Sequence, residues 1–167
     1  LSSLGEGLRL FVLEAFTQFG SHIVAVTPGK TETFGISGII STTRPLALED
    51  AQALARLSGV EVVVPVVMGN SQVKADKRSR YTSVAGVGPG AAQAWKLSVA
   101  SGSFLPTEDF TTGRALAVLG SELKEELFGD ANALGQFVHI GGNRFRVVGV
   151  LASKGEFLGT DLDDMIY

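Results

Sequence analysis

The sequence predicts an α+β protein, in which a strand–helix–strand segment is followed by a longer, mostly β segment. Two patterns lead to this prediction. Apolar residues recur at three- and four-residue spacing in only a few stretches, and beyond Gly69 they fall in short runs between glycine-rich turns. The 167 residues are 45% hydrophobic and 19% charged, which is typical of a chain with a folded core rather than a disordered one.

Residues 1–20 predict an amphipathic helix that ends at Gly20. Its apolar stripe consists of Leu4, Leu8, Phe11, Val12, Ala15, Phe16 and Phe19. Two interpretations are open. The stripe packs into a core, or the helix is a stalk that leads out of a membrane helix located before Leu1.

Residues 21–68 predict a compact strand–helix–strand layer. One strand is expected over His22–Thr27 and another over Glu61–Met68, where Pro65 favours an edge position or a bulge. The helix between them, expected over Leu48–Leu57, has two acidic residues in its first turn, where they favour the helix dipole. Residues Lys30–Thr43 are rich in Gly, Ser and Thr without a steady period, which favours a loop.

Residues 69–167 predict short strands joined by tight turns. The strands are expected over residues 73–74, 80–87, 115–119, 137–140 and 144–150, and a further strand begins at the C-terminus. A polar hairpin tip is expected at residues 75–79 and a second turn at Gly141–Asn143. The helix expected over Ser121–Phe128 has Ser121 in position to act as its N-cap. Residues 151–160 are expected to be loop.

The overall composition excludes several classes of function. A net charge of −3 argues against a nucleic-acid interface, which needs clustered Lys and Arg. The chain has no cysteine, so thiolate metal sites, disulfides and cysteine nucleophiles are absent. No window approaches the roughly 18–20 apolar residues of a membrane span, and the N-terminus does not resemble a secretory signal. Both ends look cut, and we expect the chain to be an excised piece of a larger protein.

The stretch "VAGVGPGAAQAW" at residues 84–95 resembles the strand, glycine loop and helix that hold phosphate in nucleotide-binding folds. Gly86, Gly88 and Gly90 do not have the dinucleotide-binding spacing, and no Lys-Ser or Lys-Thr pair follows them. Pro89 has no amide hydrogen, so one donor of a phosphate cradle would be missing. We therefore interpret the stretch as a tight corner between a strand and a short helix.

The histidines and acidic residues offer weak support for catalysis. His22 and His139 lie in apolar strand patterns, where partly buried structural histidines are commoner than catalytic bases. Glu108 and Asp109 are adjacent and do not share a helix face, so they favour a helical turn near Pro106 over an acid/base pair.

Three further groups of residues are candidates for a metal, binding or catalytic site. Asp161, Asp163 and Asp164 could ligate calcium, but the glycine and terminal glutamate of an EF-hand are absent. The hairpin-tip cations could contact anionic lipid or an acidic partner, although a solvated tip is the simpler interpretation; they are Lys74, Lys77, Arg78 and Arg80. The Gly120–Ser121 pair lacks the second glycine of a nucleophile elbow.

Several stretches resemble one known family. "FGSHIVAVTPG" and "PLALEDAQALARLSGVEVVVPVV" resemble segments that follow the first membrane helix of MacB-like and FtsX-like ABC transporter permeases. "AVLGSELKEELFG" followed by "LGQFVHIGGNRFRVVGVL" resembles the rest of that family's periplasmic core, and the resemblance runs in order from about Phe19 to Tyr167.

This resemblance implies an organisation of the chain. Residues 1–20 would be a stalk helix, residues 21–68 a porter-like α/β subdomain that is incomplete here, and residues 69–167 a mostly β, Sabre-like subdomain. Membrane helices would lie on both sides of the domain. Ala47 departs from the family pattern, because the family often has a Ser or Thr helix cap at that position.

The resemblance also implies a function. The domain would be the extracytoplasmic part of a plasma (inner) membrane permease and would couple ATP-driven movement of the membrane helices to substrate export. It implies a separate cytoplasmic ABC ATPase, a membrane-fusion adaptor, a homodimer or heterodimer and no nucleic acid. It assigns no catalytic, cofactor-binding or metal-binding residue to this domain.

Two other functions stay open. The domain could be a periplasmic module that captures substrate or handles lipoproteins, using an apolar surface of the loop at residues 30–43. The apolar residues of that loop are Phe34, Ile36, Ile39 and Ile40. The third alternative is an enzyme that uses the glycine-rich stretch.

Overall fold

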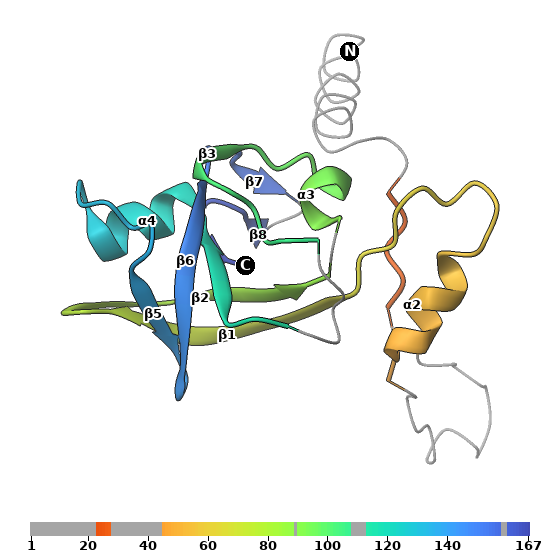
Figure 1. Cartoon of the computed structure of the whole chain (residues 1–167), viewed down its shortest axis with the longest axis horizontal. Helices are drawn as coiled ribbons and strands as arrows, with labels where there is room; N and C mark the ends of the chain where they lie inside the picture. The colour runs from red at the N-terminus through yellow and green to blue at the C-terminus, as the bar shows by residue number, and fades with distance from the viewer. Residues whose placement is uncertain (1–22, 28–44, 89, 108–112, 158–159) are drawn as a thin grey trace, which may run out of the picture. The chain divides into compact units, whose positions relative to one another are not determined.

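The computed structural model describes residues 23–27, 45–88, 90–107, 113–157 and 160–167 (Figure 1). The chain divides into two compact units at the bond between Val63 and Val64. The predictions for the helix over residues 1–20, the loop over residues 30–43, His22, Pro89 and Glu108–Asp109 lie outside the described residues. No helix among the described residues is both long enough and apolar enough to cross a bilayer.

The unit before Val64 contains helix α2 (Leu48–Leu54). The α2 helix is three residues shorter than predicted, because the backbone forms turns from Ala55 onward. Ala47 precedes it, and its amide donates to the Asp50 carboxylate at 2.9 Å, which is half of a reciprocal cap. The acidic side chain therefore takes part in the cap, although Ala47 has no hydroxyl to complete it.

The predicted strand–helix–strand layer is wrong for the residues of this unit that the structure describes. Residues 23–27 and 61–63 are not part of any helix or strand ladder. No residue of α2 is buried. A strand requires a partner for its backbone groups, and apolar patterning alone does not provide one.

The unit from Val64 onward is built mainly from strands. They are β1 (Val66–Ala75), β2 (Arg78–Val87), β3 (Val99–Gly102), β4 (Leu116–Leu119), β5 (Phe137–Ile140), β6 (Asn143–Leu151) and β9 (Met165–Ile166). The helices are α3 (Ala91–Ala94) and α4 (Ser121–Phe128), and a separate ladder joins β7 (Glu156–Phe157) to β8 (Thr160–Asp161). Strands β3, β7 and β8 were not predicted, because they are short and lie in stretches without strict alternation.

Six strands close on themselves in the order β6–β4–β9–β2–β1–β5, with β5 pairing back to β6; we call this arrangement the strand ring. The pairs β4–β6 and β2–β9 are parallel and the other pairs in the ring are antiparallel. Strand β3 pairs with the last residues of β6. Closure leaves β4 and β6 hydrogen-bonded on both edges, which favours a rigid unit.

The β1–β2 hairpin is longer than the sequence predicted. The ladder runs without a break from Val66 opposite Val87 to Ala75 opposite Arg78, so the tip consists only of Asp76 and Lys77. The predicted strand that ended at Met68 and the predicted strand at residues 73–74 are one continuous strand. Gly69 interrupts the apolar pattern but not the ladder, because a glycine in a strand still offers both backbone groups.

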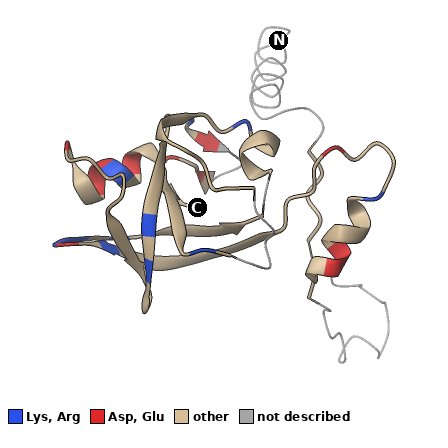
Figure 2. Cartoon of the chain, viewed as in Figure 1, with Lys and Arg blue, Asp and Glu red and all other residues tan. Residues whose placement is uncertain are grey.

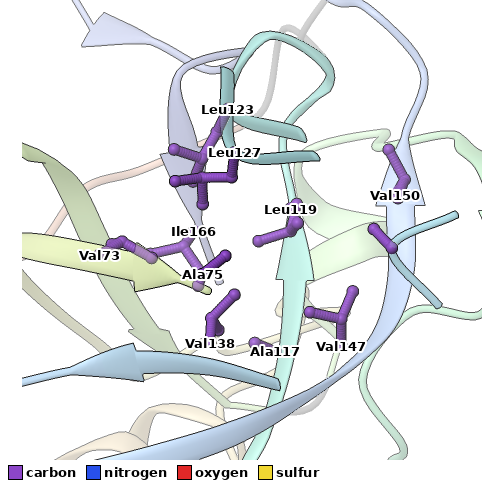
Figure 3. Close-up of a cluster of buried hydrophobic side chains, with 11 residues drawn as sticks. Val73, Ala75, Ala117, Leu119, Leu123, Leu127, Val138, Val147, Val150 and Ile166 are labelled. Carbon is purple, nitrogen blue, oxygen red and sulfur yellow. The ribbon is translucent and has the colours of Figure 1, made fainter. Parts of the chain in front are cut away.

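Two apolar clusters stabilise this unit, one on each face of the sheet. The first lies inside the strand ring and under α4 (Figure 3); it includes Val73, Leu119, Leu123, Val138 and Ile166, which are all fully buried. The second lies on the opposite face of β4 and β9 and includes Val118, Leu151, Met165 and Tyr167, with Trp95 and Phe104 packed against it. Consecutive residues such as Leu119 and Val118 belong to different clusters, as the two-residue period of a strand requires.

Gly120 and Gly149 lie where segments of the backbone pass too closely to leave room for a side chain. A Cβ on Gly120 would overlap the carbonyl oxygen of Asp163, and one on Gly149 would overlap the carbonyl oxygen of Ser103. Gly149 lies just after a register shift between β4 and β6, where residues 102–103 pass over the strand. Neither crossing can accommodate a side chain without movement of the backbone.

Replacing Gly120 by Ala is expected to lower the free energy of unfolding by about 1–3 kcal/mol, because Asp163 and the start of α4 must move apart. Urea denaturation followed by circular dichroism measures the change. Gly69→Ala is the matched control, since nothing lies within 4 Å of a Cβ at Gly69. Equal effects of the two substitutions would contradict the overlap at Gly120.

Candidate functional site

The glycine-rich stretch forms the predicted corner between a strand and a short helix. Strand β2 ends at Val87, Gly90 has a φ of 86° and α3 begins at Ala91. The Gly88 amide donates to the Pro65 carbonyl at 2.9 Å, so it is already engaged within the fold. A Cβ on Gly88 would lie 2.7 Å from Cδ of Pro65, and close packing against this proline explains the glycine there.

The same corner borders a pocket of about 590 Å³. The pocket has a size within the range of small-molecule sites, roughly 300–1,000 Å³. Its apolar wall comes from β2, α3, β4, β5, β6 and the segment before residue 108, and includes Val84, Ala92, Phe104, Leu105, Ile140 and Phe145. Gln93, Thr107, Arg114 and Asn143 supply polar groups. Residues 108–112 fall between two lining residues in sequence and are outside the described part of the chain.

The pocket is therefore the candidate binding site of this unit. Its chemistry suits a mainly apolar molecule with a few polar groups, because apolar surface predominates and the polar side chains are few. Tyr167 also lines it, and burial raises the pKa of the Tyr167 hydroxyl to about 12. That hydroxyl is protonated at neutral pH and is not suited to act as a base.

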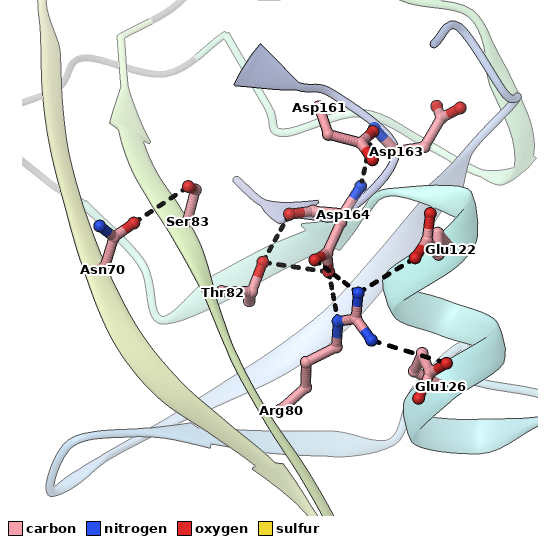
Figure 4. A network of polar contacts seen from close by, with 9 residues as sticks. All are labelled: Asn70, Arg80, Thr82, Ser83, Glu122, Glu126, Asp161, Asp163 and Asp164. Carbon is pink, nitrogen blue, oxygen red and sulfur yellow. Dashed lines mark hydrogen bonds and ion pairs between the residues drawn. The ribbon is translucent and has the colours of Figure 1, made fainter. Parts of the chain in front are cut away.

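A second set of polar residues forms a network around Arg80 (Figure 4). The Arg80 guanidinium donates to both carboxylate oxygens of Asp164 at 2.8 Å and to Glu122 at 3.0 Å, and it lies 3.6 Å from Glu126. The hydrogen bond to Asp164 raises the pKa of Arg80 above its ordinary value. Because Asp164 precedes β9 and both glutamates lie on α4, Arg80 joins β2 to two other elements.

Asp163 organises the neighbouring turn. Its carboxylate accepts hydrogen bonds from Ser153 Oγ at 2.6 Å and from the amides of Lys154 at 2.7 Å and Gly155 at 2.9 Å. Burial alone would raise the pKa of Asp163, but these hydrogen bonds and one from Ser121 outweigh it and hold the pKa below the ordinary 3.8.

The N-terminus of α4 is capped differently from the prediction. Gly120, not Ser121, is the N-cap residue. The first amides of the helix, on Glu122 and Leu123, donate to the Asp163 backbone carbonyl at 3.0 and 3.1 Å. A carbonyl from a distant segment thus takes the place of a capping side chain, and only its position in the fold reveals this.

The three aspartates that were weighed as calcium ligands have structural partners. Asp161 accepts from the amides of Asp163 and Asp164 at 2.9 and 3.3 Å and so closes the turn before β9. Asp163 and Asp164 bond to the turn at residues 153–155 and to Arg80, respectively. Among the described residues, no three His, Asp or Glu side chains are grouped as metal ligands.

The four hairpin-tip cations do not act as one group. Arg80 is bound by carboxylates, and Arg78 donates to the Glu126 backbone carbonyl at 3.3 Å. Lys74 is exposed and lies on the opposite side of β1 from the buried Val73 and Ala75. His139 is exposed on β5, not partly buried as its apolar surroundings in sequence led us to expect.

Sequence reasoning missed the pocket. Its lining comes from separate segments, and no local spacing connects Phe104 with Ile140 or Phe145. The sequence pattern relates the glycines at its edge to a phosphate-binding loop and gives no indication of a pocket for an apolar ligand.

Asp163 predicts a specific pH dependence. Its pKa is lower in the folded chain than in the unfolded chain, so its stabilisation is present above about pH 4 and is lost as the pH falls through the folded pKa. Asp163→Asn is expected to lower the free energy of unfolding by about 1–2 kcal/mol at pH 7, and by progressively less below pH 4. Urea titrations at several pH values measure this difference.

The control for this experiment is Asp130→Asn, at an exposed position after α4. It is expected to change stability by less than about 0.5 kcal/mol throughout. A deficit of Asp163→Asn that stayed constant from pH 7 to pH 3 would contradict the assignment.

Comparison with known proteins identifies the family of this chain. Residues 1–167 match the family described as the MacB-like periplasmic core domain. The chain is 34% identical over 165 residues to a macrolide export ATP-binding/permease protein, MacB, of Hyphomonas neptunium, which covers 98% of this chain and 25% of that protein. It is 33% identical over 163 residues to the pyoverdine export ATP-binding/permease protein PvdT of Pseudomonas entomophila, covering 97% of this chain and 24% of that protein.

Solved structures agree with this fold. The extracellular domain of the ABC-type transporter YknZ from Gram-positive bacteria has a TM-score of 0.61 and 26% identity, and covers 71% of this chain and 59% of that one. The periplasmic region of MacB from Actinobacillus actinomycetemcomitans has a TM-score of 0.65 and 23% identity, and covers 80% and 60%, respectively. The chain spans about a quarter of the length of its curated relatives. The chain therefore belongs to the MacB-like periplasmic core domain family of ABC transporter permeases.

Proposed function

We propose that this domain couples movement of the membrane helices of an ABC exporter, driven by ATP in a cytoplasmic ATPase, to substrate export. The match of the whole chain to the family, together with relatives that are export permeases, is the observation that carries the proposal. The domain would lie on the extracytoplasmic side of the inner membrane. The closed strand ring supports a mechanical role, because a rigid element transmits displacement better than a flexible one.

The family subdomains are part of the same proposal. Residues 1–20 would form the stalk, the unit that ends at Val63 the porter-like part, and the unit from Val64 onward, which contains the whole of β1, the Sabre-like part. The exporter would contain two such domains, as a homodimer or heterodimer, and a membrane-fusion adaptor would be a further partner. The relatives are named for macrolide and for pyoverdine export, so the names do not agree on one substrate. We assign no catalytic residue.

A flexible insertion between the two units tests the coupling. About ten Gly and Ser residues placed between Val63 and Val64 should leave ATP hydrolysis by the full-length exporter near its normal rate. Export of a macrolide or of pyoverdine should fall to background, because a flexible linker does not transmit displacement.

The matched control is the same insertion between Asp130 and Ala131, in an exposed turn after α4. It is expected to leave both activities in place. Normal export with the linker at Val63–Val64 would overturn the coupling proposal.

The pocket favours substrate capture as a second candidate function. Its apolar wall would take up a mainly apolar molecule before export, a role for which the sequence left the loop at residues 30–43 open as an alternative. The two functions are compatible, because capture in the Sabre-like part could precede displacement.

Gly86→Leu tests the pocket by placing an apolar side chain at its wall. The nearest atoms to a Cβ at Gly86 are atoms of Val67 at 3.8 Å, an ordinary contact distance, so the substitution fits the fold. The binding of the fluorescent dye N-phenyl-1-naphthylamine to the full chain is expected to weaken at least about fivefold, equivalent to about 1 kcal/mol.

Gly69→Leu is the control, since Gly69 does not line the pocket and nothing lies within 4 Å of a Cβ there. It should bind the dye as the unsubstituted chain does. Unchanged dye binding by Gly86→Leu, with folding confirmed by circular dichroism, would remove the pocket as the capture site.

A further inference from the structure

Basic side chains from three strands lie side by side on the outer face of the strand ring. Lys74 of β1 pairs with His139 of β5, and His139 pairs with Arg144 of β6. Two residues further along the same ladder, on the same face, Phe137 pairs with Arg146. We call Lys74, His139, Arg144, Arg146 and Phe137 the outer cationic face. Side chains of directly paired residues are neighbours, with Cβ atoms about 4.5–5.5 Å apart.

Burial shows that these side chains share one surface. All five are exposed, whereas the strand residues directly next to them, Val73, Val138 and Val147, are fully buried inside the strand ring. The alternation of a strand therefore directs the cations away from the core. Figure 2 shows the basic residues along β6 and the contrasting acidic residues on α4.

Phe137 holds the two arginines. The guanidinium carbon of Arg144 lies 4.2 Å from the centre of the Phe137 ring, and that of Arg146 lies 5.9 Å from it. Both distances are within the range of cation–π contacts, about 6 Å. The ring remains 41% exposed, so it orients the arginines and still offers apolar surface. Tyr81, opposite Gln72 in the β1–β2 ladder, adds a second exposed aromatic ring on this face.

The strands that form this face supply no carboxylate to balance its charge. Strands β1, β2, β5 and β6 contain no Asp or Glu. Within the part of the chain that the structure describes, Glu122 and Glu126 of α4 and Asp164 pair with Arg80, and no ion pair involves Lys74, Arg144 or Arg146. The outer cationic face is a local concentration of positive charge on a chain whose net charge is −3.

We propose that the outer cationic face docks an extracytoplasmic protein that presents a carboxylate-rich surface. Arginine forks bind carboxylates through two parallel hydrogen bonds, and Arg, Tyr and Phe are enriched in protein interfaces. A lipid surface fits less well. Negative lipid potential is characteristic of the cytoplasmic leaflet and attracts clusters of four to eight cations next to a membrane helix, whereas these cations lie on strands of a periplasmic domain. The proposal does not depend on the coupling function.

Binding of fluorescein-labelled poly-L-glutamate to the full chain tests this proposal by fluorescence anisotropy. Arg144→Glu with Arg146→Glu is expected to weaken binding at least about tenfold at low salt, or about 1.4 kcal/mol. Arg144→Gln with Arg146→Gln should give an intermediate loss, and it keeps the test valid if the charge reversal affects folding. Binding to the unsubstituted chain should weaken as salt is raised to about 0.15 M.

The matched control is Arg56→Glu with Lys96→Glu, which changes the net charge by the same amount at exposed positions that are not among the residues of this face. It should bind within about twofold of the unsubstituted chain, equivalent to about 0.4 kcal/mol. Equal losses in the two reversals would overturn the proposal, because net charge alone would then explain the binding. Binding to phosphatidylglycerol-containing vesicles without binding to poly-L-glutamate would overturn it in favour of a lipid surface.

Discussion

Closure of the strand ring depends on β9, a strand of only two residues between β2 and β4. So few ladder bonds cannot position a strand alone, and the residues before β9 supply what is missing. Asp164 is bound by Arg80 of β2, and the Asp163 carbonyl accepts from the first amides of α4. After the strand, Tyr167 and Val118 exchange two backbone hydrogen bonds at 2.8 and 2.9 Å. The Arg80–Asp164 pair and these backbone hydrogen bonds together fix the position of β9, and β9 completes the ring.

This constraint explains the positions of most residues that looked chemical in the sequence. The aspartates near the C-terminus, Arg80 and Gly120 have one shared structural role, which is to hold β9 and α4 against β2. A strong charge-assisted pair such as Arg80–Asp164 is typical of a junction between distant segments as well as of an active site. The two candidate binding surfaces, the apolar pocket and the outer cationic face, do not include these residues.

The sequence predicted the elements whose signals are local. Helix α4 matches its predicted bounds, and the β5–β6 hairpin and the glycine corner lie where the pattern placed them. The predictions failed where the outcome depends on partners far away in the chain. Residues 23–27 have an apolar strand pattern without a ladder, and the α4 amides of Glu122 and Leu123 donate to the carbonyl of Asp163, far downstream in the sequence. Neither the pocket nor the alignment of Lys74, His139 and Arg144 could be predicted without the pairing of β1, β5 and β6.

Strand β6 has a consequence for how the two binding surfaces relate. Asn143 and Phe145 line the pocket, whereas Arg144 and Arg146 belong to the outer cationic face. Successive residues of one short backbone segment thus serve opposite surfaces. Any ligand that shifts this segment from the inside changes the spacing of the arginines outside. By thermodynamic linkage, a partner that fixes the arginines changes the affinity of the pocket by the same factor. An occupied pocket and an empty one would then differ in what they present to the periplasm.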